Sequence, residues 1–90
     1  DLIALLHNHN EGHDKIWGAV RANGVVLSFW GKRGAKLAFK EYRTAYDAEK
    51  VSWKKMDKGY NRAEKDVLPE DFEGQLMMAA LGMVKFALEN

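Results

Sequence analysis

The stretch KIWGAVRANGVVLSFWG, residues 15–31, decides the fold of this chain. It contains two runs of β-branched and aromatic residues separated by Ala22-Asn23-Gly24. Asn-Gly is the strongest short hairpin signal because both residues accept the positive φ angles of a type I′ turn. The stretch therefore predicts a β-hairpin with strands at about residues 15–21 and 25–30.

The segments on either side of this hairpin also have the pattern of strands. In DLIALLHN, residues 1–8, apolar side chains fall on two sides, which is consistent with a strand buried on both faces or with a short helix. We favour the strand. The loop that follows, HNHNEGHD, is rich in turn-forming residues. AKLAFKEYR, residues 35–43, alternates as a third pleated strand would.

The period of the sequence changes at Thr44. Thr44 and Asp47 resemble a capping box, and small and apolar residues then recur at helical spacing as far as Met56. Gly59 is placed to end this helix with a left-handed cap. A final helix, with Pro69 in its first turn, is predicted to run to about residue 90.

The predicted fold class is α+β: a small antiparallel β-sheet of about four strands, with one helix packed across it and an added C-terminal helix. The chain has 90 residues, 47% of them apolar and 30% charged, which is typical of a single domain spanning residues 1–90. It contains no cysteine, which excludes disulfides and thiolate metal sites. The longest mainly apolar run, residues 76–88, is too short to cross a bilayer. We therefore expect a soluble, intracellular protein of the cytoplasm, nucleoid or nucleus, without a membrane partner.

The formal net charge of +1 conceals an uneven distribution along the chain. Residues 1–31 carry a net charge of −1, residues 32–65 of +6 and residues 66–90 of −4. A cationic centre of this kind attracts polyanions locally without making the whole protein basic. The alternative interpretation is a solvated helix face that happens to carry lysines.

A tryptophan opens the most positive turn of this region. SFWGKRGAK, residues 28–36, places Trp30 and Gly31 directly before Lys32 and Arg33. Together with KIWGAV, the hairpin, a predicted helix and the KGY that follows it, this order of features resembles the WGR domain, a small nucleic-acid-associated module named for its Trp-Gly-Arg turn. The resemblance covers about residues 14–60 and leaves residues 66–90 as a helical extension. It implies an antiparallel sheet with a helix across it, and a role in binding DNA ends or nicks, often beside catalytic domains such as poly(ADP-ribose) polymerases.

The resemblance also assigns roles to the turn. In the family the motif Trp stacks on a sugar or base and the Arg contacts phosphate or a neighbouring domain, which implies stacking by Trp30. Lys32 stands where the family has Arg, and Lys lacks the planar fork that grips a phosphate with two hydrogen bonds. Arg33 would supply that fork only if its side chain left the turn on the same side as Trp30. The alternative for Trp30 is a core aromatic at a strand end.

Further cations follow the turn. Lys50, Lys54 and Lys58 are spaced by four and share one helix face, although Asp47 and Asp57 are placed to neutralise it. The predicted nucleic-acid-binding residues are Trp30, Lys32, Arg33, Lys36, Lys54 and Lys58.

Catalytic and metal-binding motifs do not stand out in the sequence. It has no nucleophile elbow, phosphate-cradling glycine loop, HExxH pattern or recognisable acid pair, so we expect a protein that is not an enzyme and needs no cofactor. His7, His9 and His13 invite a metal site, but without a carboxylate to orient them we expect loop histidines and no metal. The predicted function is a non-catalytic accessory module that binds DNA or RNA. The alternative is a protein-interaction domain, an adaptor or inhibitor, on a WGR-like scaffold.

The last segment, FEGQLMMAALGMVKFALEN, carries more apolar surface than one sheet should need. In helical projection its apolar residues spread over well more than half of the circumference, with a narrow polar strip between them. We therefore predict self-association, or docking on a protein partner, by the side opposite Phe72, Ala79 and Met83. The alternative is a helix that fills the core under an unusually bare sheet. The predicted partner interface consists of Met77, Leu81, Val84 and Leu88.

Overall fold

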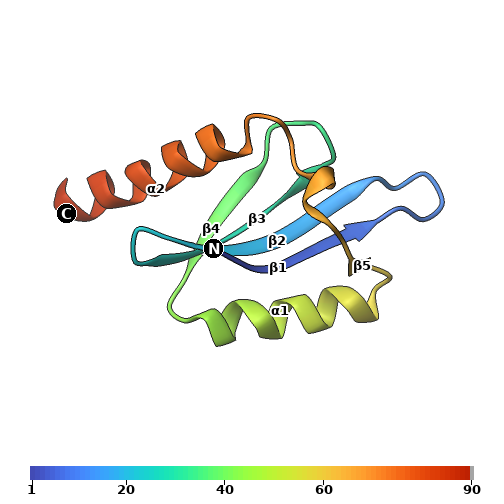
Figure 1. Cartoon of the computed structure of the whole chain (residues 1–90). Coiled ribbons are helices and arrows are strands. Elements are labelled where there is room, and N and C mark those ends of the chain that lie inside the picture. Colours follow the sequence, from blue (N-terminus) through green and yellow to red (C-terminus); the bar gives the residue numbers. More distant parts are fainter. Residues whose placement is uncertain (90) are drawn as a thin grey trace.

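The computed structural model describes the backbone of residues 1–89 and the side chains of residues 1–83, and it has the predicted α+β fold. A five-stranded antiparallel sheet has the strand order β4-β3-β2-β1-β5 (Figure 1). The strands are β1 (Leu2–Asn8), β2 (Lys15–Ala22), β3 (Val25–Lys32), β4 (Ala38–Tyr42) and β5 (Asn61–Arg62). The helices are α1 (Ala45–Asp57), the short 3-10 helix η1 (Lys65–Val67) and α2 (Phe72–Glu89).

The predicted hairpin is confirmed and forms the centre of the sheet. Its turn has φ angles of 51° at Asn23 and 80° at Gly24, both in the left-handed region that Asn-Gly accepts. The register runs without interruption from the pair Ala22 and Val25 to the pair Lys15 and Lys32. The second hairpin strand therefore extends two residues beyond the predicted end, as far as Lys32.

Each face of the sheet is covered by one helix. Successive side chains of a strand point to opposite faces, and the first strand buries apolar residues on both, as its sequence predicts. Leu5 belongs to a core shared with Phe72 and Ala80 of α2, whereas Leu6 belongs to a core shared with Ala48 of α1. Figure 1 shows the two helices on either side of the sheet. We call these two surfaces the α2 face and the α1 face.

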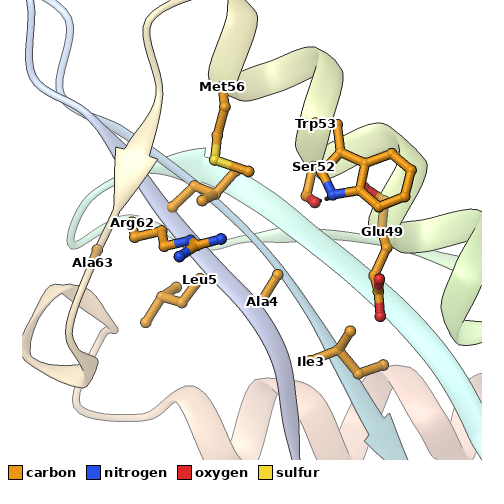
Figure 2. Close-up of a pocket in the computed structure, with 10 residues that line it drawn as sticks. Ile3, Ala4, Leu5, Glu49, Ser52, Trp53, Met56, Arg62 and Ala63 are labelled. Atoms are coloured by element: carbon orange, nitrogen blue, oxygen red, sulfur yellow. Dashed lines mark hydrogen bonds between the residues drawn. The ribbon is translucent and has the colours of Figure 1, made fainter.

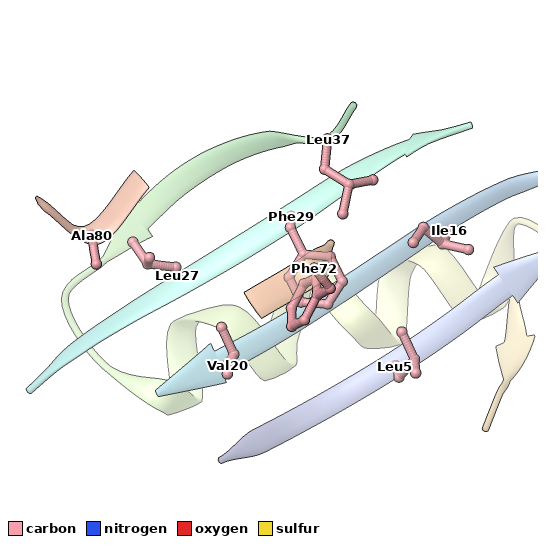
Figure 3. Packing of buried hydrophobic residues seen from close by; sticks show 8 residues of the cluster. All are labelled: Leu5, Ile16, Val20, Leu27, Phe29, Leu37, Phe72 and Ala80. Carbon is pink, nitrogen blue, oxygen red and sulfur yellow. The ribbon is translucent and has the colours of Figure 1, made fainter. Parts of the chain in front are cut away.

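The α2 face has an aromatic centre. The ring centroids of Phe29 and Phe72 are 4.7 Å apart, and the two rings lie at the middle of the cluster drawn in Figure 3. Phe29 also lies over Gly18 of the neighbouring strand, so closely that a Cβ atom at Gly18 would come within 2.3 Å of the ring. Only glycine leaves room for this ring, and Phe29 thereby becomes fully buried.

The ends of α1 follow the sequence prediction, and the start of α2 does not. Thr44 Oγ1 accepts a hydrogen bond from the Asp47 backbone N–H at 3.1 Å, and Gly59 has a φ of 105° just after the helix. The last helix begins at Phe72 instead of including Pro69, whose carbonyl accepts the first N–H of α2 at 3.0 Å. The connector also holds β5 and η1, which are too short to leave a periodic pattern in the sequence. Over the described part of the chain, no helix combines the length and apolar character needed to cross a membrane.

Candidate nucleic-acid interface

Trp30 lies at the margin of the area that α1 covers. It pairs across the sheet with Trp17 of β2 and with Ala38 of β4, so all three point to the α1 face. Trp17 is buried beneath α1 with 2% of its surface exposed, whereas Trp30 keeps 39% of its surface in solvent. The indole of Trp30 is therefore partly accessible to solvent beside the area that α1 covers.

Lys32 lies two residues beyond Trp30 on the same strand and on the same face. Its direct cross-strand neighbour is Lys15, an exposed residue at the start of β2. Facing residues in an antiparallel pair have Cβ atoms only about 5 Å apart, and like charges there are destabilising. Neither ammonium group has an ion-pair partner among the described residues. Two unneutralised cations thus stand beside the exposed indole, an arrangement that an anion would stabilise.

Lys15 is absent from the predicted site, although the sequence contains the signal that locates it. A two-residue turn at Asn23-Gly24 pairs residues whose numbers are equally distant from the turn, so Lys15 must face Lys32. The same rule places Trp17 opposite Trp30. The register of the hairpin would have revealed the cation pair.

Arg33 lies on the other side of the sheet. Its Nε donates to both carboxylate oxygens of Asp14, each at 3.1 Å, and Asp14 Oδ1 lies 2.6 Å from His7 Nε2. His7 is opposite Ile16, a residue of the α2 face. The hydrogen bond with His7 is the main cause that lowers the pKa of Asp14, and Arg33 lowers it further. Arg33 is therefore held by a carboxylate through its Nε and does not stand beside Trp30.

Lys36 is also separated from Trp30. It lines a groove of about 520 Å³ on the side of α2, together with Phe39 of β4 and Gly74 and Met78 of α2. Leu37, the next residue, is buried in the core of the α2 face. Of the predicted turn cations, only Lys32 shares a face with Trp30.

The helix lysines Lys54 and Lys58 lie on the part of α1 that faces away from its buried residues Ala48 and Ser52. At about 100° per residue, Lys54 is about 160° and Lys58 about 120° around the helix from Ser52, so both point mainly to solvent. Both are exposed, and neither has an ion pair within the described part of the chain.

Lys50, the remaining member of the predicted helix ridge, is engaged locally. Lys50 Nζ lies 3.8 Å from Asp47 Oδ1 and 5.0 Å from the centre of the Tyr46 ring. Of the two acids expected to neutralise the lysine ridge, Asp47 pairs with Lys50. Asp57 forms no ion pair among the described residues.

Besides Lys15 and Lys32, the strands place Lys40 and Arg21 on the α1 face, and no acid. Lys40 is exposed and pairs with Ser28, which places it on the α1 face next to Ala38, the strand partner of Trp30. Among the residues of β2, β3 and β4 that alternate onto the α1 face, four are cationic and none is acidic. We call the following set the Trp30 face: Lys15, Trp30, Lys32 and Lys40.

The predicted partner interface on α2 is partly described. Met77 and Leu81 expose 60% and 54% of their surfaces, on the side of α2 away from the buried Phe72 and Ala80. Val84 and Leu88 lie outside the residues whose side chains are described. Met78, which the prediction did not include, is even more open at 72%.

The histidines lie around one end of the sheet. The rings of His7 and His9 stack with centroids 5.4 Å apart, and His7 is engaged by Asp14. Among the described residues, no group of three or more His, Cys, Asp or Glu side chains is arranged to hold a metal ion.

No protein-family model, curated protein or solved structure matches this chain. The resemblance to the WGR domain therefore rests on the residues of its motif alone and stays a prediction.

Proposed function

We propose that this protein is a non-catalytic module that binds nucleic acid through the Trp30 face. The observation that carries the proposal is the half-exposed indole of Trp30 beside the facing pair Lys15 and Lys32, on a strand surface without an acidic residue. An aromatic face offers a stacking platform for any base or for a sugar, and nearby cations neutralise phosphates.

The energetic terms suit a polyanion with aromatic groups. Stacking on one aromatic side chain contributes about 1–3 kcal/mol per base. Each phosphate that a lysine neutralises releases a counterion, which makes binding stronger at low salt. Lys32 stands in place of the motif Arg and acts as a point charge, and Lys15 adds a second positive charge beside it. In this proposal the two charges attract phosphate without the two-hydrogen-bond geometry of an Arg side chain. In this proposal Arg33 and Lys36 contribute only to the long-range field.

Fluorescence anisotropy with labelled nicked, blunt-ended and single-stranded DNA tests the proposal. At about 50 mM salt we expect binding in the micromolar range, and we expect Trp30→Leu to weaken it about 5- to 100-fold, the equivalent of one lost stacking contact. The matched control is Trp53→Leu, because Trp53 is similarly exposed at 48% but lines a hollow between α1 and β1. Absence of binding to DNA and RNA at this salt concentration, or equal effects of the two tryptophan changes, would refute the proposal.

A second candidate function is protein interaction through α2, as an adaptor or inhibitor. It is favoured by the exposed Met77, Met78 and Leu81, since methionines supply an adaptable apolar surface of the kind used at partner grooves. The two functions use opposite faces of the sheet. Substitutions on α2 therefore discriminate between them, because they should leave binding of DNA unchanged.

A further inference from the structure

A hollow lies between β1 and α1, away from the Trp30 face. It has a volume of about 380 Å³, and its lining comes from β1, α1 and β5 (Figure 2). We call it the β1–α1 hollow. Its uncharged lining includes Ile3, Ala4, Ser52, Trp53 and Met56.

The hollow exists because small side chains face each other behind an irregular strand. The register between β1 and β2 shifts between Leu2 and Ala4, and such a bulge reorients side chains locally. Both Ile3 and Ala4 consequently pack with the core of the α1 face. Ala4 and the buried Ser52 are too small to fill the space between strand and helix. Trp53, with 48% of its surface exposed, forms a wall of the hollow.

The outer edge of β1 is open beside this hollow. β5 pairs only with Leu6 and His7, and the Ala63 N–H then donates to the Leu5 carbonyl at 2.9 Å. The N–H of Leu5 points to the same side as its carbonyl, because both groups of a strand residue share one edge. Within the described chain, β1 has no other strand on this side. Ala63 lies beside this N–H, so an additional extended segment would pair with the edge of β1 beyond Leu5, toward the start of the strand.

Opposite charges stand at the two ends of the hollow. In Figure 2, the side chain of Arg62 extends from β5 over β1, whereas Glu49 extends from α1 toward Ile3. Neither side chain has an ion pair among the described residues. Arg62 pairs with Leu6, and Glu49 extends toward Ile3, three strand residues away. A free amino acid carries both charges on one carbon and cannot reach both ends.

We propose that the β1–α1 hollow binds an extended peptide segment of a partner protein. An apolar side chain of the peptide enters between Ala4 and Ser52 and packs on Trp53. An acidic residue of the peptide pairs with Arg62, and a basic residue about three positions away pairs with Glu49. The peptide backbone pairs with the edge of β1 that β5 leaves uncovered. Charge complementarity and the open strand edge thus select the same occupant.

Panning a phage-displayed random heptapeptide library on the immobilised chain tests this proposal, because the partner is not needed. We expect an enriched sequence with an apolar residue between an acidic and a basic one. Anisotropy with the labelled synthetic consensus peptide then measures binding. Arg62→Glu, at an exposed position that tolerates the change, should weaken binding about tenfold, the loss of roughly one desolvated charge pair.

A charge swap and a filled hollow make the test specific. A peptide in which Lys replaces the acidic residue should regain affinity for the Arg62→Glu variant. Ala4→Met, which fills the hollow, should abolish binding, whereas Trp30→Leu should leave it unchanged and so separate this site from the nucleic-acid interface. The proposal would be overturned if panning enriched no peptide on the unmodified chain beyond those enriched on the Arg62→Glu variant. It would also be overturned if the charge-swapped peptide did not regain affinity. Light scattering that shows dimers broken by Arg62→Glu would also overturn it, because a second copy would then be the occupant.

Discussion

Replacing both Lys15 and Lys32 by glutamine tests whether this lysine pair serves nucleic-acid binding or the stability of the fold. If both ammonium groups contact phosphate, their loss lowers the slope of log K against log salt by about 1.8 for duplex DNA, since each contact contributes about 0.9. A fourfold rise in salt would then cost the variant about 12-fold less affinity than it costs the unmodified protein. The same change removes two like charges that face each other across the hairpin. We therefore expect the free energy of unfolding to rise, by about 0.2–1 kcal/mol.

Anisotropy over a salt series measures the slope, and urea unfolding measures the stability. The matched control is Lys36→Gln together with Lys65→Gln, which also removes two positive charges but leaves the Trp30 face intact. Equal slopes for the two double variants would show that only the overall charge matters. A loss of stability in the Lys15 and Lys32 variant would refute the reasoning that these residues repel each other in the folded protein.

Three further predictions concern the scaffold. Gly18→Ala should lower the free energy of unfolding in urea by about 1–3 kcal/mol because its Cβ would meet the Phe29 ring, whereas Gly74→Ala, in open space on α2, should raise it by about 0.5–1 kcal/mol. The lowered pKa of Asp14 means that its ionised form stabilises the fold above pH 3.8, and that this contribution is lost as the pH falls through the lower folded-state pKa. Asp14→Asn should remove that part of the pH dependence of the melting temperature, and an unchanged profile would contradict the role of the His7 and Arg33 contacts. Leu81→Glu should change stability by less than about 0.5 kcal/mol because the side chain is exposed, and any self-association seen by light scattering should disappear.

Strands β1 to β4 and the first helix were predictable because their signals are local. Asn23-Gly24 can adopt the left-handed conformations of its turn in any context, and the turn then sets the pairing of Lys15 with Lys32. Thr44 caps α1 through a hydrogen bond to a residue only three positions away. The nearest neighbours along the chain decide such features, so the sequence alone carries the information.

The sides on which functional groups meet were decided by tertiary contacts. Nothing near Arg33 in the sequence shows that its guanidinium binds Asp14, 19 residues earlier, on the face opposite Trp30. Likewise, the β1–α1 hollow depends on a bulge at the edge of the sheet and on which flank of α1 faces β1. Sequence by itself determined strands β1 to β4, helix α1 and which residues face each other in the hairpin. Only the packed structure decided which cations share a surface with the exposed indole, because burial and ion pairing depend on distant segments that meet when the chain folds.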